Sequence, residues 1–211
     1  LERRLTACTV TRFSDGEVTS ADLAITKALR LQQMASGFAQ SDEGNTKRFT
    51  PNQRALALSE VIESLPKHSK FIVWAVYREN YVDIRKVLEA RGVTYVELTG
   101  EVPQGVRSAN IARFCGDADV RALIGNPQAA GIGINLVEAE YSIFYSRGFS
   151  LENDLQAEAR NHRGGSERHK KVTRIDLVAR GTVDEVVLCA LQDKKDVQTA
   201  VLEHLNRSNE P

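Results

Sequence analysis

The chain has 211 residues, of which 42% are hydrophobic and 27% charged, a length and composition that suit one α/β domain with a sizeable core and exclude disorder throughout. Its 28 Lys and Arg residues equal its 28 Asp and Glu residues in number, so the whole molecule offers no net attraction to a polyanion. Any contact with nucleic acid must therefore come from a local patch, and residues 160–174 carry six Lys or Arg against one Glu.

Cysteine usage and hydropathy indicate a reducing, cytoplasmic setting. The cysteines Cys8, Cys115 and Cys189 are far apart and have no metal-ligand spacing with the histidines, so we expect reduced thiols and no metal site. No apolar run approaches the roughly 18 residues that a membrane span requires, and the N-terminus lacks the shape of a signal peptide. We therefore expect a cytoplasmic protein that makes no membrane contact.

Residues 1–66 are predicted to form an N-terminal extension with bracing helices. A β-prone run at 5–13 is followed by a helix expected at 20–37, which carries a broad apolar stripe. The polar run at 40–48 predicts an exposed loop or a disordered hairpin. A Thr-Pro dipeptide then supplies a cap and a first-turn proline for a helix at 50–65.

Residues 67–211 are predicted to form one lobe, because strands alternate with helices from this point on. This alternation is typical of a parallel sheet covered by helices on both faces. The expected strands are 71–76, 94–98, 122–125, 142–145 and 173–178, and the expected helices are 79–91, 104–115, 151–163 and 182–205.

The helix expected at 151–163 lies in the densest motif of the chain, residues 126–166, which also holds a glycine-rich turn and a buried apolar strand. In such a helix Gln156, Arg160 and Arg163 lie at i, i+4 and i+7, on one face. Guanidinium forks match phosphate or carboxylate oxygens and stay charged at any working pH. The spacing therefore predicts an anion site, although a solvated basic face paired with a neighbouring glutamate is equally open.

Sequence context adds a resemblance. The segments AAGIGINL (129–136) and QAEARNHRGGS (156–166) resemble motifs five and six of the second RecA-like lobe of superfamily-two helicases, in particular the Swi/Snf ATPases. Their sixth motif is QAxDRxHRxGQ. The matching residues are Gln156, Ala157, Arg160, His162, Arg163 and Gly165, and the departures are Ala159, Gly164 and Ser166.

The resemblance implies a RecA-like fold and a role in ATP hydrolysis. In the family, two RecA-like lobes clamp ATP between them, and the second lobe supplies arginines. Arg163 is then the arginine finger on the γ-phosphate and Arg160 its partner, with Gln156 beside them in the cleft. Gly131 and Gly133 would let the backbone approach the nucleotide closely.

The resemblance also implies contacts to DNA, which in the family come from strand ends and go mostly to phosphates. The matching positions are Thr99, Gly100, Asn126, Gln128, Ala130 and Phe149. Three departures affect this surface: Pro127 stands where a threonine is usual, Ala75 and Val76 replace a serine and a glutamine, and Phe149 replaces a tryptophan. Phe149 can present an aromatic face to a ligand or lie in the core.

No G-x-x-x-x-G-K-[ST] loop occurs in the sequence, so no segment is expected to cradle the β- and γ-phosphates or to hold Mg²⁺. The resemblance therefore implies that ATP and Mg²⁺ are bound mainly by a partner, the N-terminal RecA-like lobe of the same protein. We expect this chain alone to bind neither tightly and to hydrolyse no ATP. The whole protein would be an ATP-dependent DNA helicase or translocase, and the compact motif spacing suggests a phage or bacterial one.

Other functions are open at this point. A non-catalytic nucleic-acid-binding or regulatory module could keep the same fold, although Arg160 and Arg163 disfavour it. A different superfamily-two motor, such as a restriction-enzyme translocase, is disfavoured by the Swi/Snf-like form of the sixth motif. A dinucleotide-binding turn is strongly disfavoured, because Leu136 stands where G-x-G-x-x-G requires its third glycine.

Overall fold

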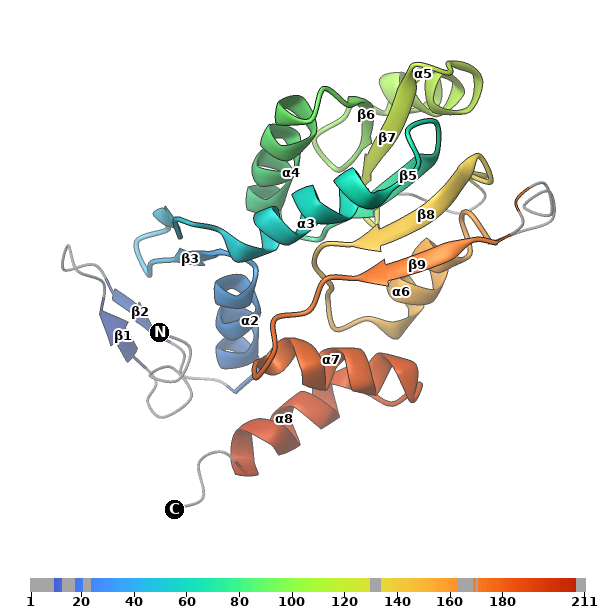
Figure 1. Ribbon diagram of the computed structural model, residues 1–211. Coiled ribbons are helices and arrows are strands. Elements are labelled where there is room, and N and C mark those ends of the chain that lie inside the picture. Colours follow the sequence, from blue (N-terminus) through green and yellow to red (C-terminus); the bar gives the residue numbers. More distant parts are fainter. Residues whose placement is uncertain are drawn as a thin grey trace. The chain divides into compact units, whose positions relative to one another are not determined.

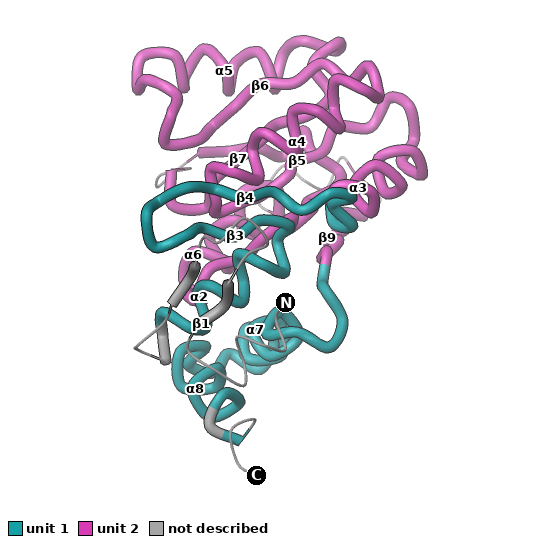
Figure 2. Tube along the Cα trace, turned by 90° about the vertical axis from the view of Figure 1, so that its left-hand side faces the viewer, with its two compact units in different colours: residues 1–54, 178–211 teal, residues 55–177 magenta. Residues whose placement is uncertain are grey.

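The computed structural model describes residues 10–12, 18–20, 24–129, 134–162, 169 and 171–207. The chain divides into two compact units, residues 1–54 with 178–211 and residues 55–177 (Figure 2). The boundary drawn from the sequence, between 66 and 67, coincides with neither edge of these units. A bracing role for residues 1–66 stays a prediction.

The larger unit contains a five-stranded sheet in the order β6-β7-β5-β8-β9, in which every neighbouring pair is parallel (Figure 1). The strands are β5 (Lys70–Trp74), β6 (Thr94–Leu98), β7 (Val120–Gly125), β8 (Ala139–Phe144) and β9 (Thr173–Asp176). The helices are α3 (Gln53–Ser64), which belongs to this unit from Ala55 onward, α4 (Arg78–Ala90), α5 (Gln104–Gly116) and α6 (Leu151–Glu158). All five expected strands are present, and β6 has the expected bounds.

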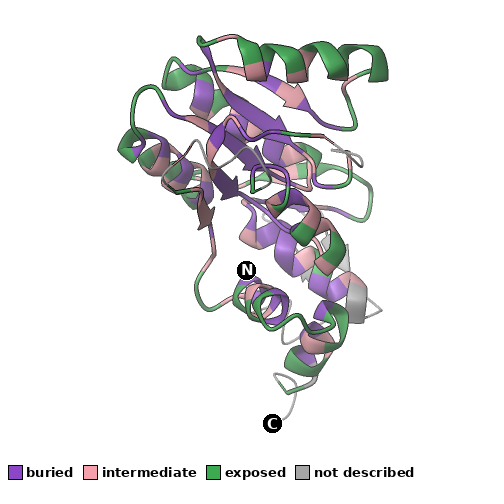
Figure 3. Ribbon diagram, turned by 90° about the vertical axis from the view of Figure 1, so that its right-hand side faces the viewer, coloured by how far each residue is buried: buried purple, intermediate pink, exposed green. Residues whose placement is uncertain are grey.

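The central strand β5 feeds two separate cores because its side chains alternate between the faces of the sheet. Phe71 and Val73 join one cluster, with Leu58 from α3 and Ile84 from α4 among its members. Ile72 and Trp74 join the other, whose helical members are Phe114 from α5 and Ala157 from α6. Figure 3 shows the sheet buried and the outer helical faces exposed. The α/β fold with helices on both faces is confirmed.

Two close contacts surround the Trp74 ring at the end of β5. The indole Nε1 of Trp74 donates to Ser142 Oγ on β8 at 2.8 Å. A Cβ added to Gly125 would lie 2.4 Å from Cζ3 of that indole ring, so only glycine fits beside it.

The loop after α4 requires glycine for its backbone conformation. Gly92 has φ +63°, and the amides of Gly92 and Val93 donate back to Glu89 and Leu88, as in a Schellman end.

The smaller unit holds two antiparallel hairpins and three helices among its described residues. They are β1 (Val10–Arg12) with β2 (Val18–Ser20), β3 (Phe38–Gln40) with β4 (Thr46–Arg48), α2 (Ala24–Ala35), α7 (Val183–Gln192) and α8 (Val197–Arg207). Within this unit the buried Arg54 and Asp184 side chains form an ion pair. The polar run at 40–48, which was predicted to be an exposed loop or a disordered hairpin, forms part of the ordered hairpin of β3 and β4.

The single helix expected at 182–205 is wrong, because the chain breaks it at Lys194. Lys194 has φ 54°, in the left-handed region, and its amide donates to Leu191 O at 3.1 Å. The next amide, of Lys195, donates to Ala190 O at 2.9 Å. These two bonds form a Schellman end that is usually built on glycine, so the residue type gave no warning of the break.

Candidate functional site

The residues expected to contact DNA follow the carboxyl ends of neighbouring strands. Thr99 and Gly100 follow β6, and Asn126 and Gln128 follow β7, the adjacent strand. Phe149 is half-buried in the segment after β8. Parallel strands end at a common edge, which is where ligands bind in open α/β sheets. The structure therefore brings the first four of these residues to one edge, while Ala130 lies outside the described residues.

The turn after β6 is held by Thr99, whose side chain is fully buried. The Glu101 amide donates to Thr99 Oγ1 at 3.3 Å, and Arg107 Nη2 donates to Thr99 O at 3.2 Å. Gly100 is exposed, and a Cβ added there would meet nothing within 4 Å. In this turn the threonine hydroxyl is used internally, whereas the glycine presents its backbone to solvent.

The turn after β7 is organised by Asn126. Its Oδ1 accepts from the amides of Gln128 at 2.8 Å and Ala129 at 3.3 Å, and its Nδ2 donates to Tyr81 Oη at 2.8 Å. Tyr81 Oη in turn donates at 3.4 Å to the carbonyl of Ala75, the residue directly after β5. Burial raises the pKa of Tyr81 and the bond from Asn126 partly offsets this. Asn126 thus shapes the turn, and Gln128 is the exposed side chain on it.

Helix α6 begins as predicted but ends five residues early. Ser150 caps it, since its Oγ accepts from the Asn153 amide at 3.3 Å, and the helix ends at Glu158, not at residue 163. The reason is tertiary. The carbonyl of Arg160 accepts from the Leu136 amide at 2.9 Å, and Asn161 Nδ2 donates to Ala139 O at 3.4 Å. Contacts to the first residue of β8 and to the segment before it therefore replace the next helical turn.

The early end of α6 leaves Gln156 inside the helix and Arg160 in the turn after it. Gln156 is half-buried and its Nε2 donates to Glu152 Oε1 at 2.9 Å. Arg160 lies beyond the helix and is only 4% exposed, so it is not part of a solvated basic face. The helix predicted to carry Gln156, Arg160 and Arg163 therefore ends too early to do so, and their position on a common side stays a prediction. Arg163, Gly131 and Gly133 lie outside the described residues.

A partly buried ion-pair network lies beside α6, and the sequence did not predict it. Arg174 on β9 contacts Asp154 at 2.9 Å, Glu158 at 3.2 Å and Asp176 at 3.0 Å. The sequence counts Arg174 as part of a basic patch, but three carboxylates neutralise its charge. The sequence carries only a weak indication of this ion pairing, because the three acidic partners are spread over α6 and β9.

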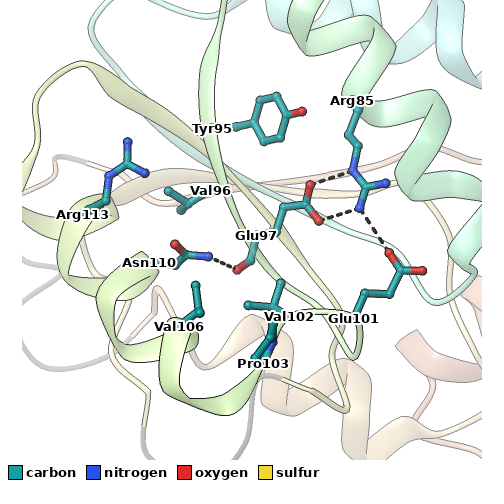
Figure 4. Close-up of a pocket in the computed structure, with 10 residues that line it drawn as sticks. All are labelled: Arg85, Tyr95, Val96, Glu97, Glu101, Val102, Pro103, Val106, Asn110 and Arg113. Carbon is teal, nitrogen blue, oxygen red and sulfur yellow. Dashed lines mark hydrogen bonds and ion pairs between the residues drawn. The ribbon is translucent and has the colours of Figure 1, made fainter.

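An open groove of about 410 Å³ lies along the outer strand β6, between α4 and α5 (Figure 4). Arg85 dominates one side, where its guanidinium donates twice to Glu97, at 2.7 Å each, and once to Glu101 at 3.2 Å. These carboxylates raise the pKa of Arg85, the hydrogen bonds to Glu97 being the main cause. Because no predicted site residue lines the groove, we assign it no part in the predicted chemistry.

The described residues contain no group of three or more His, Cys, Asp or Glu side chains that could hold a metal ion. In the same residues no helix is both long and apolar enough to cross a membrane.

Comparison with known proteins identifies the family. Residues 53–165 match the family model described as the helicase conserved C-terminal domain. The chain belongs to this family. The crystal structure of the C-terminal part of the Fun30 ATPase domain superposes on it with a TM-score of 0.65 and 23% sequence identity, over 75% of this chain and 53% of that chain. At that identity the likeness shows the fold alone.

Sequence relatives narrow the family to the Snf2 group of superfamily-two helicases. The chain is 33% identical over 185 residues to the Caenorhabditis elegans homolog of the SWI/SNF-related, matrix-associated, actin-dependent regulator of chromatin subfamily A containing DEAD/H box 1. It is 35% identical over 159 residues to the chromatin-remodeling ATPase INO80 of Cryptococcus neoformans. These alignments cover 83% and 74% of this chain but 18% and 9% of the relatives. The relatives are eukaryotic, so the predicted phage or bacterial origin has no support.

Proposed function

We propose that this Snf2-type helicase C-terminal domain is the second motor lobe of an ATP-dependent DNA translocase. In this role Arg163 and Arg160 act on the γ-phosphate of ATP held mainly by an N-terminal RecA-like lobe. The observation that carries the proposal is the family match over 53–165, which includes both arginines together with the strand ends of the sheet. The chain spans less than a fifth of the length of the relatives quoted above, the remainder of which leaves room for a first lobe.

The residues that this chain offers suit an anionic ligand and leave the metal to the partner lobe. Gln156 and the two arginines supply N–H donors, and guanidinium forks match phosphate oxygens. No described cluster of carboxylates or histidines could hold Mg²⁺. Bound ATP supplies the phosphoryl group that is transferred to water. The arginines stabilise the charge that develops on that group, and such fingers are worth about a thousandfold or more in rate.

The proposed DNA contacts lie on the edge formed by the strand ends. Gly100 and Gln128 are exposed there, in turns held by the internal bonds of Thr99 and Asn126. Contacts through backbone amides and one neutral side chain reach phosphates without reading bases. We therefore propose that Gly100 and Gln128 bind the DNA backbone directly, that Thr99 and Asn126 shape the turns, and that Ala130 and Phe149 contribute contacts beside them.

One observation favours the alternative function, a nucleic-acid-binding or regulatory module without motor activity. Arg160 is 4% exposed, and a guanidinium in that position reaches an external phosphate only after it is uncovered. If Arg160 instead supports the turn at 159–162, Arg163 alone would face the nucleotide. The two arginines therefore need separate tests.

The test is turnover of the protein that carries both lobes, measured as DNA-stimulated phosphate release. For Arg163→Ala we expect kcat to fall about a thousandfold, with KM for ATP changed only a few-fold. Arg207→Ala is the control, because Arg207 is an exposed arginine on α8. Unchanged turnover of Arg163→Ala would remove Arg163 from the mechanism and favour the alternative.

Two further measurements complete the test. Arg160→Ala should lower kcat without changing the melting temperature if Arg160 contacts phosphate, and should lower both if it supports the turn. The 211-residue chain alone should release no phosphate from ATP. DNA-stimulated release by the chain alone would show that it needs no first lobe.

A further inference from the structure

Two arginines tie α6 to the sheet. Arg147 follows β8 and contacts Asp154 on α6, with 3.7 Å between Nε and Oδ1, and it also pairs with Asp176 on β9. Arg174 on β9 contacts both carboxylate oxygens of Asp154, at 2.9 and 3.2 Å, and both of Asp176. Each guanidinium therefore bridges the helix and the last strand, and Asp154 receives both.

The network is mostly shielded from water, so its geometry is restricted. The side chains of Arg147 and Asp154 are 6% and 8% exposed, and those of Arg174 and Asp176 are 23% and 20% exposed. Both guanidiniums lie over the Phe144 ring, at 5.2 Å for Arg147 and 4.1 Å for Arg174. A buried charge must keep its partners. A lysine cannot reproduce the planar fork that contacts two carboxylates and stacks on a ring.

These contacts anchor helix α6 itself, whereas the bonds of Arg160 and Asn161 to residues 136 and 139 hold the turn that follows it. Helix α6 has eight residues, fewer than a helix needs to be stable alone. Its buried residues are Asp154 and Ala157, and alanine packs only a methyl group. Glu158, the last helical residue, also contacts Arg174. The network therefore determines how α6 is oriented on the sheet, from its middle to its end.

We propose that Asp154, Arg147 and Arg174 are positioning residues for the ATPase site. They hold α6, and with it Gln156 and the turn at 159–162 that precedes Arg163 in the sequence. The inference rests on the proposed function, in which these residues face the nucleotide. It adds that turnover depends on a charge network whose members need not touch ATP. Small displacements of a catalytic group can cost a hundredfold in rate, so a loosened α6 should lower kcat.

The experiment compares Arg174→Lys with Arg85→Lys. Arg85 is a matched control because its side chain is 29% exposed, close to the 23% of Arg174, and makes bidentate bonds to Glu97 on β6. It lies on α4, away from α6. In the protein with both lobes, Arg174→Lys should lower kcat about tenfold with KM for ATP within about twofold. Arg85→Lys should leave both within about twofold. Asp154→Asn, which removes the charge and keeps the shape, should act like Arg174→Lys.

Hydrogen exchange on the 211-residue chain supplies the readout that a general loss of stability would not give. Arg174→Lys should speed exchange of the α6 amides by about tenfold and leave the amides of α4 unchanged. A uniform increase across the unit, or an unchanged rate in α6, would overturn the inference.

The outcomes separate the inference from the proposed function. If Arg163→Ala loses turnover while Arg174→Lys and Asp154→Asn keep it, the function stands and the positioning role is refuted. If none of the three changes turnover, the proposed function is refuted and the inference with it. Selective loosening of α6 together with a lower kcat supports both.

Discussion

Gly125→Ala offers the sharpest test of the packing at the carboxyl edge of the sheet. The added Cβ would lie 2.4 Å from Cζ3 and 2.6 Å from Cε3 of Trp74, about 1 Å closer than a normal contact between carbons. Neither side can move easily. Trp74 is fully buried and bonded to Ser142, and β7 is hydrogen-bonded to strands on both sides. Overpacking of this kind costs about 1–3 kcal/mol, and we expect the upper end here.

The assay is thermal unfolding followed by tryptophan fluorescence, because Trp74 is the only tryptophan in the chain and lies in the larger unit. A loss of about 3 kcal/mol corresponds to a fall in melting temperature of about 6–12 °C for a chain of this size. Gly148→Ala is the control: its added Cβ would meet only Val76 Cγ1, at 4.0 Å. Its melting temperature should stay within about 2 °C of the parent.

A double variant tests the cause. Trp74→Leu removes the ring that the new methyl group meets, so Gly125→Ala with Trp74→Leu should cost less than the sum of the single changes, as followed by circular dichroism. If Gly125→Ala melts like Gly148→Ala, or if the two changes simply add, the packing argument for this strand end is refuted.

Two further predictions concern stability. Burial and, second, the hydrogen bond to Glu89 raise the pKa of Tyr95 to about 12. The neutral phenol therefore contributes its full share to the free energy of unfolding below the unfolded-state pKa near 10, and this share is lost as pH rises toward 12. In urea titrations the parent should therefore lose about 1 kcal/mol more between pH 9 and 11 than Tyr95→Phe; parallel losses would contradict the assigned pKa. Lys194→Gly should stabilise the smaller unit by about 0.5–1 kcal/mol, because glycine removes the strain of φ 54°. Lys195→Gly should not stabilise the unit. If calorimetry shows equal effects for the two variants, the backbone strain assigned to Lys194 is refuted.

The elements of the sheet could be predicted because each carries its own local signal. The apolar runs of β5 to β9 alternate with helices, and a glycine marks the end of α4. The edge at which Thr99, Gly100, Asn126 and Gln128 gather followed from the resemblance and from parallel strands ending together. Local signals failed in two places. A lysine at φ 54°, a conformation that its residue type does not favour, divides α7 from α8, and a distant backbone bond from Leu136 helps to end α6.

The sequence by itself determined the fold, the family and the edge of the sheet at which the candidate residues gather. Only the tertiary structure decided which charges remain for a ligand. Arg174 reads as part of a basic patch but is neutralised by carboxylates from α6 and β9, and Arg160 reads as a solvent-facing arginine but is buried. The physical reason is range: periodicity and caps act within a few residues, whereas the partner of a charge is chosen by proximity in three dimensions.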